Sequence, residues 1–247
     1  MSDAIVGRNA VLEALKRGRS LNKLYILDGA RGGSIGEITA LARESRVPIE
    51  YTRLEKLDEL AAGMRHQSVV ALGAPIEFQS LETVLATVKA KAKVPFLLLL
   101  DELQDPQNVG ALIRTANAAG VDAVLLPSRR SCPLNAVVSK ISAGAVEYVP
   151  VVQIGNISQT IQELQKQGFW VIGADMAGES QYYEADLTGA IVVVVGAEGK
   201  GLGRLVKEKC DLLVRIPMLG QVASLNASVA GAILLYEVVR QRSLCKN

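Results

Sequence analysis

The sequence contains few of the residues that mark several common classes of protein. Only 4% of its 247 residues are aromatic, and it has one histidine and three cysteines. Because Cys132, Cys210 and Cys245 are widely spaced and odd in number, neither a disulfide framework nor a zinc site is expected. Apolar runs are only about five to eight residues long, which is too short to cross a bilayer. We therefore expect neither a metal ion nor a membrane as a partner.

The two kinds of charge are almost balanced, with 27 Lys and Arg residues against 25 Asp and Glu residues. A net charge of +2 does not by itself indicate a nucleic-acid-binding protein, although a local basic face would be enough to hold phosphates. Arg8, Arg17, Arg19, Lys23 and Arg31 are candidates for such a face, with a plain solvated surface as the alternative. The opening residues lack the basic and apolar regions of a signal peptide, so a cytoplasmic location is expected.

Hydropathy patterns divide the chain into two parts. Short helical and strand patterns alternate over residues 1–76 and predict a small α/β domain. Residues 77–94 are polar and carry lysines, and we interpret them as a linker with one helix at 81–90. Residues 95–247 contain nearly continuous apolar strands separated by helices, which is typical of a mostly parallel sheet with helices on both faces. Strands are expected there at 96–100, 123–126, 148–152, 170–173, 191–195 and 212–216, and a last helix at 224–240.

Three of these strands are followed by segments that contain polar residues or glycines. Asp105–Ala116 (DPQNVGALIRTA) is either a capped helix with a solvated arginine or part of a site. Gly196–Arg204 (GAEGKGLGR) has the spacing of neither a P-loop nor a dinucleotide-binding loop, but its glycines can expose backbone N–H groups to a ligand. Ile216–Ala230 places Ser224 and Asn226 at a helix start, where capping alone would explain them. Because ligands bind beyond the carboxyl ends of parallel strands, the three segments together predict a ligand site.

The same three segments resemble the signature motifs of the SpoU (TrmH) family of RNA 2′-O-methyltransferases, and Ser142–Ala145 (SAGA) is similar to that family as well. The resemblance covers the chain from about residue 95 to the end, in motif order and in spacing. It implies S-adenosylmethionine as the cofactor, a C-terminal trefoil knot, and a homodimer with its active site near the dimer interface. Periodicity would not predict the knot, since knotted chains are very rare.

The N-terminal part resembles the small RNA-substrate-binding domain of this family. The similarity lies in GRNAV at Gly7–Val11 and HQS at His66–Ser68, and this domain is common in members that methylate a guanosine ribose in 23S ribosomal RNA. Ser68 departs from the usual glycine, which would give the backbone more freedom. The resemblance therefore implies 23S ribosomal RNA as the substrate, and His66 is expected to be structural more than a contact to RNA.

Five residues match the functional positions of the family: Asn108, Arg114, Glu198, Ser224 and Asn226. The family arginine is proposed to be the base that acts on the ribose 2′-hydroxyl. Because a guanidinium normally stays protonated, we hypothesise that Arg114 instead binds the adjacent phosphate and stabilises the developing alkoxide. Asn108 is expected to orient the ribose or Arg114, and Glu198 to hold Arg114 or Asn108 in place. Ser224 and Asn226 are expected to order the knot and the RNA pocket.

Cofactor contacts are expected mainly from the backbone at Gly196, Ile216 and Leu225, with Ala174 and Met218 nearby. Three other functions remain open. A tRNA 2′-O-methyltransferase of the same family is disfavoured mildly by the N-terminal domain. A nucleotide-dependent oxidoreductase is disfavoured by the broken GxGxxG spacing. A non-catalytic RNA-binding protein is disfavoured by the intact set of functional residues.

Overall fold

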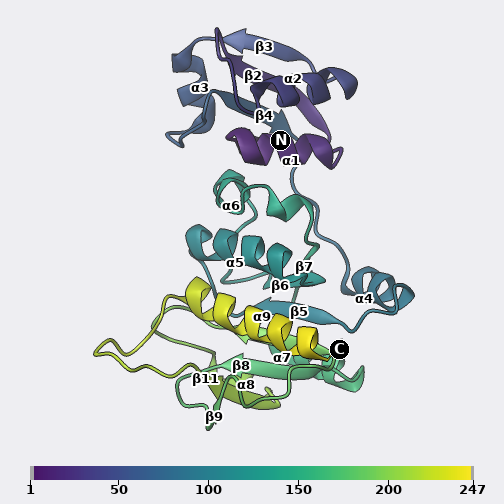
Figure 1. The fold of residues 1–247 in the computed structure, drawn as a ribbon, viewed down its shortest axis with the longest axis vertical. Coiled ribbons are helices and arrows are strands. Elements are labelled where there is room, and N and C mark those ends of the chain that lie inside the picture. Colours follow the sequence, from purple (N-terminus) through teal and green to yellow (C-terminus); the bar gives the residue numbers. More distant parts are fainter. Residues whose placement is uncertain (1–2, 246–247) are drawn as a thin grey trace. The chain divides into compact units, whose positions relative to one another are not determined.

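The computed structural model describes residues 3–245, which form two compact units (Figure 1). Unit 1 contains the residues up to Glu77 together with Pro133–Tyr148, and unit 2 contains Phe78–Cys132 and the residues from Val149 onward. The inserted segment Pro133–Tyr148 lies within the region that the sequence assigns to the second domain. By its contacts it belongs to unit 1 instead.

Unit 1 is built around a four-stranded sheet in the order β1-β4-β2-β3, with β2 and β3 parallel and the other pairs antiparallel. Helices α1 and α2 bury apolar side chains against one face of this sheet, and α3 packs on the other. The elements are β1 (Asp3–Val6), α1 (Arg8–Lys16), β2 (Leu21–Leu27), α2 (Ile35–Glu44), β3 (Ile49–Thr52), α3 (Leu54–Ala61), β4 (Val69–Gly73), α6 (Ala136–Ile141) and the 3-10 helix η1 (Ala145–Glu147).

The inserted segment is tied into unit 1 by a buried ion pair and by an aromatic contact. Arg19 Nη1 lies 2.7 Å from Glu147 Oε1, and both side chains are less than a tenth exposed. The Tyr148 hydroxyl donates a hydrogen bond to Glu13, and the Arg17 guanidinium lies 5.0 Å from the centre of the Tyr148 ring. Lys23 also pairs with Glu50, and Arg8 donates to the Gln67 carbonyl. Four of the five arginines and lysines considered for a phosphate-binding face are therefore engaged in contacts within unit 1.

Unit 2 contains a seven-stranded parallel sheet in the order β7-β6-β5-β10-β8-β11-β9, as the sequence predicts. Every residue of the neighbouring strands β5 and β10 is buried, because helices cover both faces. The elements are α4 (Leu81–Ala90), β5 (Phe96–Leu100), α5 (Pro106–Ala119), β6 (Ala123–Pro127), β7 (Val151–Ile154), α7 (Ile157–Lys166), β8 (Trp170–Ala174), β9 (Ser180–Gln181), β10 (Ile191–Val195), α8 (Arg204–Lys207), β11 (Leu212–Arg215) and α9 (Ala227–Leu244).

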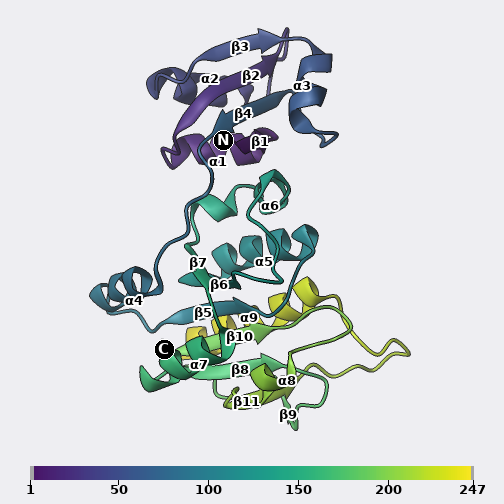
Figure 2. The same ribbon diagram turned by 180° about the vertical axis from the view of Figure 1, so that it is seen from behind.

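Helices α5 and α9 lie side by side on one face of this sheet, and α4, α7 and α8 pack on the other (Figures 1 and 2). Gly231 permits the close approach of α9, since a Cβ at this position would overlap the Leu112 side chain of α5. On the opposite face, Val84 and Val88 of α4 are part of a hydrophobic core cluster. The segment interpreted as a linker, 77–94, therefore contains a helix that contributes to the core of unit 2.

Two element boundaries differ from the sequence prediction for identifiable reasons. β7 begins at Val151 rather than at 148, since Tyr148 packs within unit 1 and Pro150 has no N–H to donate. α9 begins at Ala227 rather than at 224, because the Asn226 side chain caps it. None of the described helices is long and apolar enough to span a membrane. The trefoil knot stays a prediction.

Candidate active site

The carboxyl ends of β8, β10 and β11 and the start of α9 surround a cleft of about 300 Å³. All five residues expected to contact the cofactor line it: Ala174, Gly196, Ile216, Met218 and Leu225. Its volume lies at the lower end of the range for sites that bind small molecules. The structure thus brings these five residues, which are up to 51 positions apart in the chain, together in one cleft.

The glycine-rich loop after β10 forms one wall of the cleft by folding back on itself. The Gly201 amide donates to the Ala197 carbonyl at 2.8 Å, and Gly199 and Gly201 have positive φ angles of 75° and 64°. A Cβ at Gly196 would overlap the Gly201 carbonyl and would lie 2.6 Å from the Leu202 amide nitrogen. Only glycine therefore permits this turn, which keeps the wall of the cleft close to the strand end.

The loop between β11 and α9 forms another wall and leaves its backbone polar groups available. Among the backbone hydrogen bonds of residues 3–245 outside regular elements, none involves residues 217–225. Backbone N–H and C=O groups need a partner when they are enclosed, and here a ligand in the cleft would supply it at Met218 and Leu225. This arrangement suits recognition of a ligand by backbone atoms, as the sequence predicts.

Three of the predicted catalytic side chains meet at the start of α9. Asn226 Nδ2 donates to Asn108 Oδ1 at 2.8 Å and to Glu198 Oε1 at 3.2 Å. Asn108 is 5% exposed at the start of α5, where Asp105 caps the helix, while Asn226 and Glu198 are exposed. We call Asn108, Glu198 and Asn226 the polar trio. Because Glu198 also lines the cleft, the trio stands at its rim.

The two remaining predicted residues are placed differently. Ser224 lines the cleft beside Leu225. Arg114 is exposed on α5 and, within residues 3–245, its side chain makes no hydrogen bond or ion pair. It follows Asn108 by six residues, which places it about 9 Å further along the helix and on a different side of it. Arg114 is not among the residues that line the cleft of its own chain.

Comparison with known proteins agrees with this geometry. Residues 95–236 match the SpoU rRNA Methylase family, and residues 4–79 match the family described as RNA 2′-O ribose methyltransferase substrate binding. The chain belongs to the SpoU rRNA methylase family. It is 42% identical to YacO of Bacillus subtilis, which is named as a TrmH family tRNA/rRNA methyltransferase, over 98% of this chain and 96% of YacO.

Solved structures of SpoU methyltransferases have the same fold. The methyltransferase AviRb from Streptomyces viridochromogenes, solved in complex with S-adenosylmethionine, gives a TM-score of 0.82 at 23% identity and covers 98% of this chain and 91% of AviRb. An RNA 2′-O ribose methyltransferase gives a TM-score of 0.80 at 26% identity, covering 97% and 88% of the two chains. As a member of this family, the chain is an S-adenosylmethionine-dependent RNA 2′-O-ribose methyltransferase.

The cleft suits the cofactor of the SpoU family. Its backbone groups can bind an adenine and a ribose, and apolar Ile216, Met218 and Leu225 can cover their faces. An ion pair that the sequence analysis missed adds charge to the wall: Lys207 Nζ lies 2.6 Å from Asp175 Oδ2, and the Asp175 side chain is 7% exposed. Asp175 directly follows β8 at the carboxyl edge of the sheet, and this position was the signal that could have identified it. Lys207 carries no such signal.

Burial changes the pKa of two titratable side chains of unit 2, Asp101 and Cys210. Burial raises the pKa of the Asp101 carboxyl, while the Gly203 amide, 2.8 Å from Asp101 Oδ2, opposes the rise. Burial also raises the pKa of the Cys210 thiol to about 12, with the nearby Asp211 as a lesser cause. Cys210 is therefore a thiol at neutral pH and no nucleophile. Across residues 3–245 no group of three or more His, Cys, Asp or Glu side chains is arranged to hold a metal ion.

Proposed function

We propose that this chain transfers a methyl group from S-adenosylmethionine to the ribose 2′-hydroxyl of a guanosine in 23S ribosomal RNA, as in RlmB, the 23S rRNA (guanosine-2′-O-)-methyltransferase that its sequence resembles. The observation that carries the proposal is the polar trio at the rim of a cleft whose wall contains all five residues expected to contact the cofactor. A ribosomal substrate is supported by the presence of the substrate-binding region at residues 4–79. A cytoplasmic location and a role in ribosomal RNA processing belong to the same proposal.

The chemistry required of the protein is alignment and charge stabilisation. When bound, the cofactor would supply an electrophilic methyl group on a sulfonium, and the protein would have to align the ribose 2′-oxygen with it. The polar trio orients acceptor atoms at the rim of the cleft, where a ribose would lie. The Arg114 guanidinium binds the neighbouring phosphate and stabilises the alkoxide as the hydroxyl proton passes to water. Ser224 orders the loop between the cofactor and the RNA.

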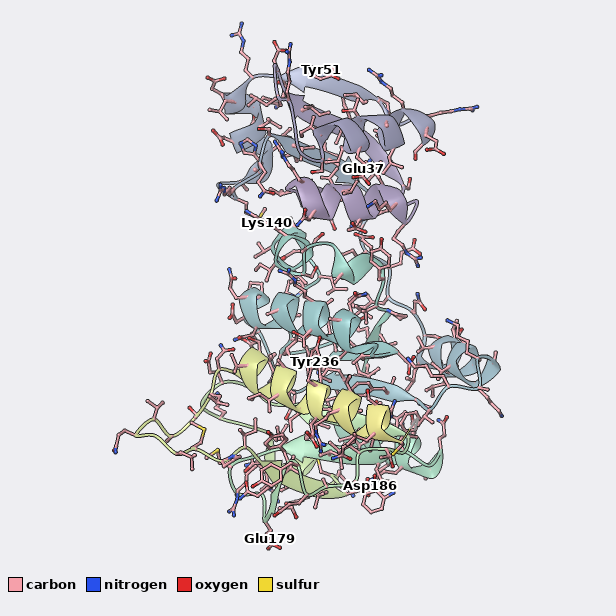
Figure 3. The ribbon with its side chains drawn as sticks, in the orientation of Figure 1. Glu37, Tyr51, Lys140, Glu179, Asp186 and Tyr236 are labelled. Atoms are coloured by element: carbon pink, nitrogen blue, oxygen red, sulfur yellow. The ribbon has the colours of Figure 1, made fainter. Side chains whose placement is uncertain are left out.

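A homodimer is part of the proposal, since Arg114 does not reach the cleft of its own chain. The supporting observation is the outer surface of α9, where Val229 and Tyr236, seven residues apart and so on the same side of the helix, are 47% and 50% exposed. Tyr236 is labelled in Figure 3. Exposed apolar side chains grouped in this way are typical of a protein interface. A second copy packed on α9 and α5 would cover them and supply its Arg114 to the cleft.

The direct test is transfer of tritiated methyl groups to transcripts of 23S ribosomal RNA and tRNA, followed by mapping of the 2′-O-methylated nucleotide. We expect a single guanosine in the 23S transcript to be methylated. Methylation of tRNA alone would replace the ribosomal assignment by the tRNA alternative, and RNA binding with no transfer would favour a non-catalytic role. Arg114→Ala should abolish transfer, while Arg114→Lys should retain part of it, because lysine keeps the positive charge but not the bidentate geometry of the guanidinium.

Mixing two inactive variants tests whether Arg114 acts across the dimer. Arg114→Ala lacks the guanidinium, and Gly196→Ala binds the cofactor poorly, so the mixture is assayed at an S-adenosylmethionine concentration too low for Gly196→Ala to transfer methyl groups on its own. If Arg114 acts on the partner's cleft, a mixed dimer contains one complete site, and roughly a quarter of the wild-type activity returns after random exchange of subunits. If Arg114 acts within its own chain, the mixture stays inactive and the cross-dimer arrangement is wrong.

A further inference from the structure

The ion pair between Asp175 and Lys207 lies in the wall of the cofactor cleft, although the sequence predicts no cofactor contact from either side chain. We propose that Asp175 binds the two ribose hydroxyl groups of S-adenosylmethionine, and that Lys207 is a positioning residue that holds the Asp175 carboxylate toward them. The inference rests on the proposed function, in that the RNA ribose is placed at the polar trio, and it holds whichever RNA is methylated.

Three contacts fix the Asp175 carboxylate at the carboxyl edge of the sheet. Its Oδ1 accepts a hydrogen bond from the Ala177 amide at 2.9 Å, and its Oδ2 lies 2.6 Å from Lys207 Nζ. A Cβ at Gly201 would lie 3.2 Å from the same Oδ2, so the glycine-rich loop packs closely against the carboxylate. The Asp175 side chain is 7% exposed. An acceptor that is held in this way loses little freedom when a ligand binds.

The Asp175 carboxylate has room for a ligand that carries two donors. Each carboxylate oxygen can accept about two hydrogen bonds, and within residues 3–245 each oxygen of Asp175 has one partner. One position therefore remains on each oxygen. A vicinal diol supplies two hydroxyl donors on neighbouring carbons, which matches an acceptor with two free positions. An acidic residue also binds a ribose hydroxyl of the dinucleotide in other parallel sheets.

The placement of the other groups around the cleft leaves Asp175 to a part of the cofactor that does not react. The polar trio lies at the starts of α5 and α9 on one face of the sheet, whereas α8 carries Lys207 on the other face. The sulfonium must face the RNA ribose, which the proposed function places at the trio. Apolar Ile216, Met218 and Leu225 suit the adenine. The cofactor ribose, which joins the adenine to the sulfonium, then supplies the two donors for Asp175.

Ligands that each lack one group test which part of the cofactor Asp175 recognises. Calorimetric titrations of the full-length chain would use S-adenosylhomocysteine, its 2′-deoxy and 3′-deoxy forms, and 5′-methylthioadenosine, which lacks the amino-acid part. Asp175→Asn should weaken binding of S-adenosylhomocysteine and of 5′-methylthioadenosine alike, by about tenfold to a hundredfold, because hydrogen bonds to a charged group are lost. Removal of either ribose hydroxyl should cost the wild type about tenfold but Asp175→Asn less than about threefold, since the partner is already lost.

Two further variants separate the carboxylate from the charges around it. Glu208→Gln is the matched control, because it removes a carboxylate from the ion pair with Arg204 at the same helix, outside the residues that line the cleft. This control should bind every ligand as the wild type does. Lys207→Met should weaken the two ligands with an intact ribose by about threefold to tenfold, because Asp175 then keeps only the Ala177 amide as a partner. Thermal unfolding checks that each variant is folded at the temperature of the titration.

Three results would overturn the assignment of Asp175. Equal losses for the deoxy ligands in the wild type and in Asp175→Asn would show that the carboxylate is only structural. A loss for S-adenosylhomocysteine without a loss for 5′-methylthioadenosine would assign Asp175 to the amino-acid part of the cofactor. Wild-type affinity of Asp175→Asn for every ligand would show that Asp175 does not bind the cofactor. A chain that shows the expected binding pattern but methylates no RNA would overturn the proposed function and leave the ribose contact in place.

Discussion

The Asn226 side chain caps a helix and also holds the polar trio together, and replacing its amide nitrogen by oxygen would separate these two roles. Its Oδ1 accepts from the amides of Ser228 (2.9 Å) and Val229 (3.3 Å) and thereby caps α9, while its Nδ2 donates to Asn108 Oδ1 and Glu198 Oε1. Asn226→Asp keeps an oxygen for the cap and replaces the donating NH₂ group by an oxygen that faces two acceptors. We therefore expect this variant to lose the polar trio while it keeps the helix.

The size of each effect follows from the same geometry. A hydrogen bond to a charged group contributes about 1.5 kcal/mol at the lower end of its usual range. We use this lower value for the bond from Asn226 to Glu198, because both residues are exposed. Repulsion between two carboxylates about 3 Å apart adds roughly 1 kcal/mol in a water-like dielectric. Asn108 can rotate its amide to donate to the new carboxylate, so the loss falls on Glu198. Together these terms predict a decrease in kcat/KM of about thirtyfold to a hundredfold.

Asn226→Ala provides the comparison, since it removes both roles. Loss of the cap costs about 1 kcal/mol, which lowers the Tm of a chain of this length by about 2–4 °C. A carboxylate at the cap position keeps the cap and interacts favourably with the helix N-terminus, which offsets part of the lost contact to Glu198, so Asn226→Asp should keep a higher Tm than Asn226→Ala. Methyl transfer assays and thermal unfolding followed by circular dichroism measure the two effects separately. An aspartate variant with wild-type kcat/KM, or one as unstable as the alanine variant, would refute the reasoning.

Three further predictions follow from backbone strain, close packing and burial. Gly196→Ala should weaken S-adenosylmethionine binding by at least about tenfold in a calorimetric titration, because the added Cβ overlaps the Gly201 carbonyl and opens the loop. Ser68→Gly should raise the Tm by about 2–4 °C, because Ser68 has a φ of 71°, which costs an L-residue roughly 1 kcal/mol. Asp101→Asn should raise the free energy of unfolding at pH 7. The folded-state pKa of Asp101 lies above its unfolded value of 3.8. The contribution of Asp101 to stability is therefore greatest below pH 3.8 and is lost as the pH rises through the folded-state pKa.

Each of these three predictions has a control variant or a result that would contradict it. Gly155→Ala adds a Cβ with no neighbour within 4 Å and should leave cofactor affinity unchanged. If Gly196→Ala binds the cofactor as Gly155→Ala does, the loop is not a wall of the cofactor cleft. A lower Tm for Ser68→Gly would mean that the loss of unfolded-state entropy outweighs the strain. Equal pH dependence of unfolding for Asp101→Asn and the wild type would contradict the assigned rise in pKa.

Local patterns predicted most of the sheet in unit 2 and the edge at which its ligand binds. The strands at Phe96–Leu100 and Ile191–Val195 are apolar throughout, and such strands require cover on both faces, which a parallel sheet with helices provides. The polar and glycine-rich segments that follow the strands predicted the cleft. The same reasoning did not find the short strand Asp3–Val6 or the helix Ala136–Ile141, since four to six residues are too few to display a period.

The sequence by itself determined which segments form strands and helices, and which loops carry polar groups, because periodicity and capping depend on residues a few positions apart. The folded chain alone decided which side chains meet. Asn226 reaches Asn108 across 118 positions, and Arg19 reaches Glu147 across 128. Arg114 is separated from Asn108 by the geometry of the helix that carries both. Contacts of this kind are set by how helices and strands pack, and packing depends on the whole core at once.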